Sequence, residues 1–158
     1  MSPEYLAGFF DGEGCIDVQR MYPKEGQGRL YVRPRIRVAQ TASCRVVLDE
    51  LQKQFGGYVA HRAHKRENER DSVSWEFLDR EGMRNMLEIM LPHLVIKREQ
   101  AKLTLWWLQN ASGRHGANGK RPRLEEARRV FMEELKAMKL DPFRSSDAAI
   151  FVIRHLLE

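Results

Sequence analysis

The chain has 158 residues, of which 42% are hydrophobic and 31% are charged, and its formal net charge is +5. These values are ordinary for one globular domain, and no apolar run approaches the ~20 residues of a membrane span. No signal peptide opens the chain, and Cys15 and Cys44 form no pairing pattern, so we expect a reduced intracellular setting, cytoplasmic or organellar, without a membrane partner.

The basic charge is concentrated in one block. Residues 19–66 contain eleven Lys/Arg against three Asp/Glu, a balance of +8, whereas the rest of the chain carries −3. This asymmetry favours a polyanionic partner, most simply nucleic acid, although a solvated charged face is the alternative. Arginine makes up 19 of the 27 basic residues, which favours planar recognition over diffuse charge.

The first predicted element is a short helix. Ser2 can serve as its N-cap and Pro3 as its first residue, and we expect it to end at Phe10 or Asp11, before the glycines that follow. Residues 15–22 then read as a strand, which the turn at 23–28 connects to the next one.

The second predicted strand, residues 30–38, has a period of two, so its side chains alternate between two faces. One face carries Tyr31, Arg33, Arg35 and Arg37, and the other carries Val32, Pro34, Ile36 and Val38. Pro34 argues against a central position in the sheet, because proline removes a donor from the ladder.

A helix follows, with Thr41 or Ser43 as its expected cap and Gly56–Gly57 at its end. Its apolar face consists of Val47, Leu48, Leu51 and Phe55. We expect residues 58–66 and 72–78 to form a second hairpin whose inward side chains are Val73, Trp75 and Phe77.

Helices fill the rest of the chain. The first is capped by Asp79 and reaches Leu91, the second spans about 97–109, the third about 124–138, and the last starts near Ser145 or Ser146. A glycine-rich basic loop at 112–123 has no assigned role. The predicted fold is α+β in the order α-β-β-α-β-β-α, as one domain over 1–158 with a core of about 3–110 and a helical extension of about 122–158.

The stretch LAGFFDGEG, residues 6–14, combines small residues with two acids at a helix end. Gly8 and Gly12 share one helix face and have no side chain to keep a partner helix away, although small residues also serve simple core packing. The terminal helix carbonyls and the Glu13 carboxylate together provide oxygen ligands and a negative potential. Such a site suits a hard divalent cation, for example Mg²⁺.

This stretch resembles the signature nonapeptide of the LAGLIDADG homing endonucleases, and seven of its nine positions are identical or chemically similar. The resemblance covers about residues 5–108 and is strongest to the single-motif members that act as homodimers. It implies an α+β core with a saddle-shaped antiparallel sheet, followed here by C-terminal helices. The implied function is site-specific double-strand DNA cleavage of the intron-homing type, on a long pseudo-palindromic target. An RNA-splicing maturase, with intron RNA as partner, or a non-cleaving DNA-binding regulator is the alternative.

The resemblance also implies residue roles. Glu13, in place of the aspartate of the motif, binds Mg²⁺ with the Gly12 carbonyl, and Ca²⁺ or Mn²⁺ can replace Mg²⁺ for binding. Asp11 has a structural role, and the interface between two chains comprises Ala7, Gly8, Asp11 and Gly12. Gln40 and Lys97 match supporting catalytic positions that organise water and stabilise charge on the phosphate. Lys97 could instead simply begin a solvated helix.

The expected DNA-binding surface lies on the two hairpins, because a two-stranded ribbon fits the major groove and presents alternate side chains to base edges. Solvent-facing arginines on a sheet are the alternative interpretation. The first hairpin contributes Asp17, Gln19, Met21, Lys24, Tyr31, Arg33, Arg35 and Arg37, and the second contributes Arg62, His64, Arg66, Ser72, Ser74 and Glu76.

Overall fold

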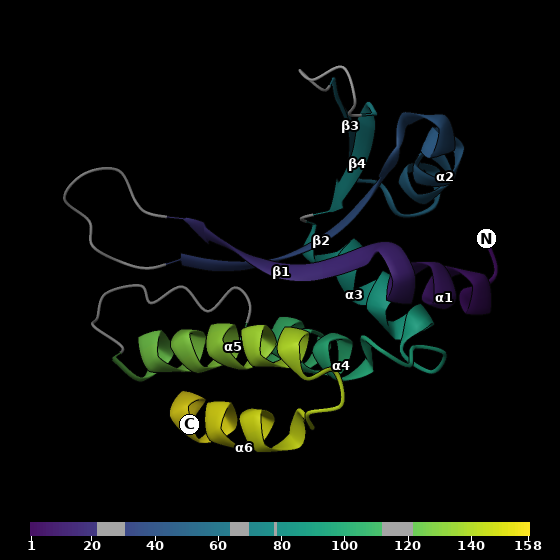
Figure 1. Cartoon of the computed structure of the whole chain (residues 1–158). Coiled ribbons are helices and arrows are strands. Elements are labelled where there is room, and N and C mark those ends of the chain that lie inside the picture. The colour runs from purple at the N-terminus through teal and green to yellow at the C-terminus, as the bar shows by residue number, and fades with distance from the viewer. Residues whose placement is uncertain (22–30, 64–69, 78, 112–121) are drawn as a thin grey trace. The chain divides into compact units, whose positions relative to one another are not determined.

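The computed structural model describes residues 1–21, 31–63, 70–77, 79–111 and 122–158 (Figure 1). Its elements are α1 (Pro3–Glu13), β1 (Gly14–Met21), β2 (Tyr31–Thr41), the 3₁₀ turn η1 (Ala42–Cys44), α2 (Arg45–Phe55), β3 (Tyr58–Arg62), β4 (Ser72–Phe77), α3 (Arg80–Met90), α4 (Arg98–Asn110), α5 (Pro122–Leu140) and α6 (Asp147–Leu157). The predicted α+β class and the α-β-β-α-β-β-α order are confirmed. Among the described residues, no helix combines the length and the hydropathy that crossing a membrane requires.

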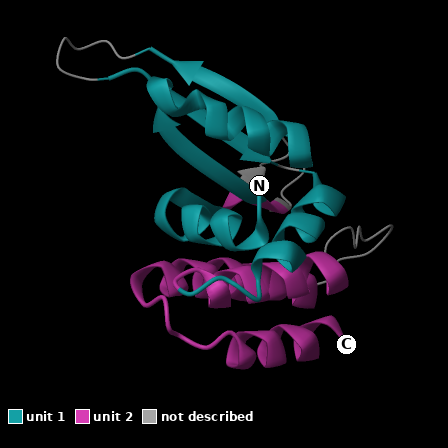
Figure 2. Cartoon of the chain, turned by 90° about the vertical axis from the view of Figure 1, so that its right-hand side faces the viewer, with its two compact units in different colours: residues 1–16, 35–95 teal, residues 17–34, 96–158 magenta. Residues whose placement is uncertain are grey.

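The chain divides into two compact units, which Figure 2 distinguishes by colour. The first unit comprises residues 1–16 and 35–95, and the second comprises residues 17–34 and 96–158. This division groups α4 with α5 and α6 rather than with the helices that precede it. The assignment of residues 1–158 to a single domain stays a prediction.

The four strands form one sheet in the order β1-β2-β4-β3. β4 pairs antiparallel with both of its neighbours, and Trp75 lies opposite Val38 on one side and Val59 on the other. As predicted, Val73, Trp75 and Phe77 are buried on one face. α2 contacts β3 and β4, so the apolar face of these strands packs in the core of the first unit.

β2 shows the predicted alternation. Val32, Pro34, Ile36 and Val38 are buried, whereas Arg33, Arg35 and Arg37 are half-buried. The expectation that Pro34 disfavours an inner strand is wrong, because β2 lies between β1 and β4. The described pairing of β2 with β4 begins at Ile36. Pro34 lies before it, so the backbone N–H that proline lacks is not needed for a hydrogen bond to β4.

α1 begins as predicted, with the Ser2 hydroxyl accepting a hydrogen bond from the Tyr5 N–H at 3.3 Å. Its end differs from the prediction, because the helix continues to Glu13 instead of stopping at Phe10 or Asp11. The N–H of Gly14 still bonds to the Phe10 carbonyl and closes the last turn. Glycine therefore lies inside the helix as well as at its end.

α2 is not capped by the predicted hydroxyls. The turn η1 comes before it, Cys44 occupies the N-cap position, and the Thr41 and Ser43 hydroxyls lie 3.0 Å from each other. The predicted helix end is confirmed, because Gly56 and Gly57 adopt φ of 83° and 81°. These values belong to the left-handed region that favours glycine.

The second unit contains the packed helices α4, α5 and α6, and the close contact between α5 and α6 is visible in Figure 1. The five α5 side chains with helical spacing are all buried: Leu124, Ala127, Phe131, Leu135 and Met138. Trp107 of α4 stacks on Phe131 with 4.4 Å between ring centroids. The sequence pattern at 124–138 therefore identified a core-facing helix.

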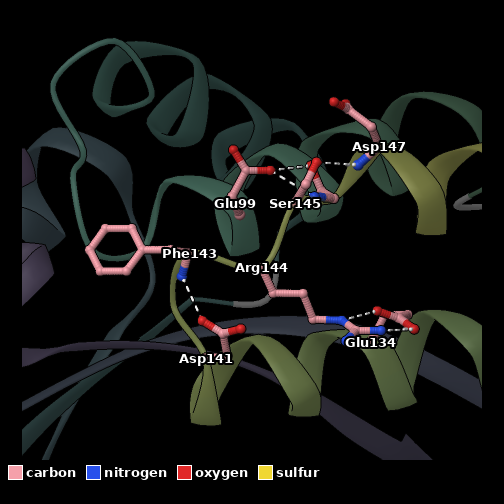
Figure 3. A network of polar contacts seen from close by, with 8 residues as sticks. Glu99, Glu134, Asp141, Phe143, Arg144, Ser145 and Asp147 are labelled. Carbon is pink, nitrogen blue, oxygen red and sulfur yellow. Dashed lines mark hydrogen bonds and ion pairs between the residues drawn. The ribbon is translucent and has the colours of Figure 1, made fainter.

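A polar network connects α4 to the start of α6 (Figure 3). The Glu99 carboxylate accepts hydrogen bonds from both the N–H and the hydroxyl of Ser146, each at 2.7 Å. Ser146 is the N-cap residue, yet its hydroxyl does not cap the helix; the Ser145 hydroxyl instead accepts from the Asp147 N–H at 3.2 Å. Lys102 forms an ion pair with Asp147 at 2.6 Å. The start of α6 is therefore held mainly by the contacts of Ser146 and Asp147 with α4, in addition to the local bond from Asp147 to Ser145.

We predict that Gly57→Ala destabilises the protein more than Gly56→Ala. A Cβ on Gly57 would lie 2.6 Å from the Glu76 carbonyl oxygen and 2.8 Å from Trp75 Nε1, whereas one on Gly56 would meet Phe77 only at 3.9 Å. Both variants carry backbone strain, but overpacking adds about 1–3 kcal/mol at Gly57. Denaturant unfolding measures the difference, and equal losses would contradict the assignment.

We also predict a pH-dependent contribution from Glu99. Burial raises the pKa of Glu99, but the Ser146 hydrogen bonds outweigh it, so the pKa lies below its ordinary value of 4.5. A carboxyl group with a lowered pKa in the folded state stabilises the protein above its ordinary pKa, and this contribution is lost as the pH falls. The stability difference between the native chain and Glu99→Gln should therefore be largest near neutral pH and shrink below pH 4.5.

Thermal unfolding across this range provides the measurement. Glu133→Gln, at an exposed position of α5, is the matched control and should show no comparable trend. A Glu99→Gln difference that stays constant with pH would contradict the prediction.

Candidate functional site

The glycine face of α1 is open in the isolated chain. Leu6, Ala7 and Phe10 are buried and α1 contacts α3, whereas Gly8 and Gly12 are exposed. A Cβ placed on either glycine would meet no atom of the described residues within 4 Å. Ala7, predicted at the interface between chains, is 0% exposed and so packs in the core of its own chain.

The two acids of the motif have different surroundings. Asp11 Oδ2 accepts a hydrogen bond of 2.7 Å from the Val95 N–H, which connects the end of α1 to the segment after α3. Glu13 is exposed, and none of the hydrogen bonds or ion pairs found among the described residues engages its carboxylate. Asp11 thus has a structural contact within its own chain, while Glu13 is available to solvent and ligands.

Gly14 explains how a strand can start directly after the helix. The buried Phe10 ring occupies the place that a Cβ at Gly14 would take, so a larger residue would force the ring to move. β1 can therefore leave α1 without an intervening loop, and the helix end with Glu13 lies beside the start of the sheet.

The residues at this helix end fit a divalent cation only as part of a larger ligand set. The described residues contain no group of three or more His, Cys, Asp or Glu side chains that could hold a metal ion. One carboxylate, Glu13, and the Gly12 carbonyl provide hard oxygen ligands. Mg²⁺ typically takes one or two carboxylates and completes its shell with water and phosphate oxygens. The donor set therefore fits Mg²⁺ bound together with a phosphate ligand.

The two supporting residues lie in different units. Gln40 is half-buried on β2 and pairs with the buried Val73 in the register. It therefore faces the same side as Val38, opposite to Arg37. Lys97 belongs to the second unit, where it is the half-buried N-cap residue of α4.

The polar face of the first unit consists of cross-strand rows on β2, β4 and β3. Residues directly opposite each other in an antiparallel pair share a face. The three rows are Arg37–Glu76–Tyr58, Ala39–Ser74–Ala60 and Thr41–Ser72–Arg62. The predicted reading residues Arg37, Arg62, Ser72, Ser74 and Glu76 therefore lie on one surface.

The other predicted DNA-binding residues are placed as follows. Arg35 has the same strand parity as Arg37, and its Nη1 lies 3.7 Å from Glu76 Oε2. Asp17, Gln19 and Arg33 are half-buried and belong to the second unit. Met21 ends β1 and Tyr31 begins β2. Lys24, His64 and Arg66 lie outside the described residues.

Tyr58 is absent from the residues predicted to bind DNA, but the structure adds it to this face. Its hydroxyl donates a hydrogen bond of 2.7 Å to Glu76 Oε2. This bond raises the pKa of Tyr58 above its ordinary value of 10.0, so the hydroxyl stays protonated at neutral pH. The sequence contains a signal for this position. In a strand over residues 58–62, the side chains of Tyr58, Ala60 and Arg62 lie on the same face, so Tyr58 could have been placed beside Arg62.

Comparisons with known proteins identify the family and the fold. Residues 6–102, more than half of the chain, match the family model of the LAGLIDADG endonuclease. The DNA endonuclease I-CvuI of Chlorella vulgaris is 36% identical over 104 residues, which cover 64% of this chain and 60% of that protein. The matched stretch thus spans less than two thirds of this curated relative.

Two solved structures show the same fold. I-CvuI in complex with its target in the presence of Ca has a TM-score of 0.68 at 24% identity and covers 98% of this chain and 91% of that one. The archaeal intron-encoded homing endonuclease I-Vdi141I complexed with DNA has a TM-score of 0.66 at 17% identity, with 98% and 95% covered. At these identities the likeness supports the fold alone. From the family match over residues 6–102 and the α-β-β-α-β-β-α architecture, the chain belongs to the LAGLIDADG endonuclease family.

Proposed function

We propose that this protein is a site-specific DNA endonuclease of the intron-homing type, which hydrolyses both strands of a long pseudo-palindromic duplex with the help of Mg²⁺. The observation that carries the proposal is the exposed Glu13 carboxylate at the end of a helix whose glycine face is open. Family membership and the DNA endonuclease named among the relatives support the same reaction.

Substrate binding is assigned to the polar face of the sheet. Arginine donates to guanine in the major groove and to phosphate oxygens, and the arginines of β2 alternate with buried apolar residues, so their charges point to one side. The +8 balance of residues 19–66 attracts the duplex before specific contacts form. The sheet face therefore binds and orients the DNA.

At the scissile phosphate, Glu13 and the Gly12 carbonyl would hold Mg²⁺. When bound, Mg²⁺ supplies Lewis-acid stabilisation of the charge on the phosphate and on the leaving 3′-oxygen. The resemblance gives the Gln40 amide the role of orienting the attacking water, and this role requires the scissile phosphate to be reachable from the side of β2 opposite to Arg37. The resemblance likewise assigns the Lys97 ammonium, which belongs to the second unit, to stabilising charge on a phosphate oxygen.

One chain offers one motif, so cleavage of two strands requires two chains in this proposal. Without side chains at Gly8 and Gly12, two α1 helices can approach closely across a two-fold axis. That symmetry places one Glu13 over each strand and predicts an approximately palindromic target. The exposed glycine face supports this assembly.

The alternative is a binding protein of the same fold, either a regulator of DNA or a maturase that binds intron RNA. The arginine-bearing sheet face would serve each of these roles. The exposed Glu13 favours cleavage, because a protein that only binds a polyanion gains nothing from an acid at this position.

We expect Glu13→Gln to reduce cleavage by at least ~10² while leaving DNA binding intact, because the amide removes the anionic ligand without a change of shape. Linearisation of plasmids that carry sites selected by the native chain, in Mg²⁺, measures cleavage; mobility shifts in Ca²⁺ measure binding. Glu133→Gln on α5 is the control. Cleavage by Glu13→Gln at the native rate would refute the role of Glu13, and tight binding without cleavage by the native chain would favour the binding protein.

We further expect Gly8→Leu to weaken self-association more than tenfold without unfolding the chain. Among the described residues, no atom lies within 4 Å of a Cβ on Gly8, so the leucine fits within one chain. Leucine also favours a helix over glycine, which costs roughly 1 kcal/mol relative to alanine, so the variant should stay folded. Between two helices the same side chain prevents close approach. Sedimentation equilibrium provides the measurement, with Ala148→Leu on the exposed side of α6 as control. A native chain that is monomeric, or a Gly8→Leu dimer of native strength, would contradict the assembly.

A further inference from the structure

Tyr58, Glu76 and Arg35 form a polar cluster on the sheet face, contributed by β3, β4 and β2. Tyr58 and Glu76 are direct cross-strand partners, and the tyrosine hydroxyl lies 2.7 Å from Glu76 Oε2. Arg35 Nη1 lies 3.7 Å from the same oxygen. Because both contacts use Oε2, neither of them occupies Oε1, which can accept a further hydrogen bond.

The carboxylate is already largely removed from water in the free chain. The Glu76 side chain is 17% exposed and the Arg35 side chain 22% exposed. The Tyr58 hydroxyl and the Arg35 guanidinium offset the cost of this burial and fix the rotamer of Glu76. A group that is fixed before binding loses little conformational entropy when a ligand arrives.

Phosphates repel a carboxylate on a surface that binds DNA. The group of the DNA that contacts Glu76 must therefore be a hydrogen-bond donor on a base. In the major groove the donors are the amino groups of cytosine and adenine, whereas guanine and thymine present acceptors. Adenine also presents the acceptor N7 beside its amino group, which repels a carboxylate. Cytosine N4 is therefore the base group that best matches Glu76.

We propose that Glu76 is a specificity-determining residue that accepts a hydrogen bond from cytosine N4 at one position of each half-site, and that Tyr58 is its positioning residue. The proposal rests on the proposed function, since it assigns a base preference to the face that binds DNA. Removing the Tyr58 hydroxyl leaves Glu76 with the Arg35 contact and its cross-strand neighbour Arg37, so the carboxylate loses its fixed orientation. The preference for cytosine then falls at that position, while contacts to phosphates elsewhere remain.

The test is a binding selection with the full chain in Ca²⁺, using a pool of randomised synthetic duplexes and sequencing of the bound fraction. The native chain should enrich cytosine at one column of each half-site. Tyr58→Phe should reduce the cytosine preference at that column by roughly tenfold, which corresponds to about 1.4 kcal/mol, and leave the preferences at the other columns unchanged. Glu76→Gln should shift the preference at the same column from cytosine toward adenine, which a glutamine amide matches bidentately.

Lys102→Met serves as the matched control, because it removes one donor to an exposed carboxylate, Asp147, in the C-terminal helices. It should leave every column unchanged. Thermal unfolding of each variant monitors the fold, and Glu76→Gln provides the second arm if Tyr58→Phe is less stable.

The outcomes separate the inference from the function on which it rests. A native chain that enriches no sequence would overturn the proposed function together with this inference. A native chain that enriches a site, with profiles unchanged in Tyr58→Phe and Glu76→Gln, would overturn the inference alone. A uniform loss over all columns would also overturn it, because that result indicates a purely structural role for the pair.

Discussion

The hydrogen bond from the Val95 N–H to the Asp11 carboxylate ties the last turn of α1 to the segment after α3, and the candidate site lies on that turn. Since Asp11 is held by the backbone of the segment after α3, the last turn of α1 cannot rotate freely against the core. Glu13, two residues later, is thereby presented at the exposed helix end. Two carboxylates in one short motif thus have different surroundings, because Asp11 is hydrogen-bonded within its own chain and Glu13 is exposed.

The strict alternation along β2 gives the sheet two chemically distinct faces. Buried apolar side chains support the strand from one side and keep the half-buried arginines on the other. Charge on this face is not uniform, because Glu76 lies among the arginines and is held by Tyr58. A surface of mixed charge can discriminate between bases as well as attract a polyanion, because a wrong acceptor is repelled.

Local patterns in the sequence predicted the elements well where one physical effect dominates. The period of two at 30–38 and the helical spacing at 124–138 both reflect burial of one face. The first is confirmed over residues 32–38, where burial is described, and the second over its full length. The predicted caps at Thr41 and Ser43 are wrong, because an extra 3₁₀ turn moves the helix start beyond them. The parity that Tyr58 shares with Arg62 could have placed it on the polar face, but its hydrogen bond to Glu76 could not be predicted, because the register between β3 and β4 decides which residue lies opposite it.

The junction between α5 and α6 constrains how the chain can be shortened. Ser146 supplies both of its donors to Glu99, so a protein cut before this residue would retain the carboxylate in a partly buried place without its hydrogen bonds. Ala149 and Ile153 of α6 are also buried, so the same cut would expose the apolar surfaces against which they pack. For protein engineering, the final helix is thus integral to the second unit and a poor place to trim.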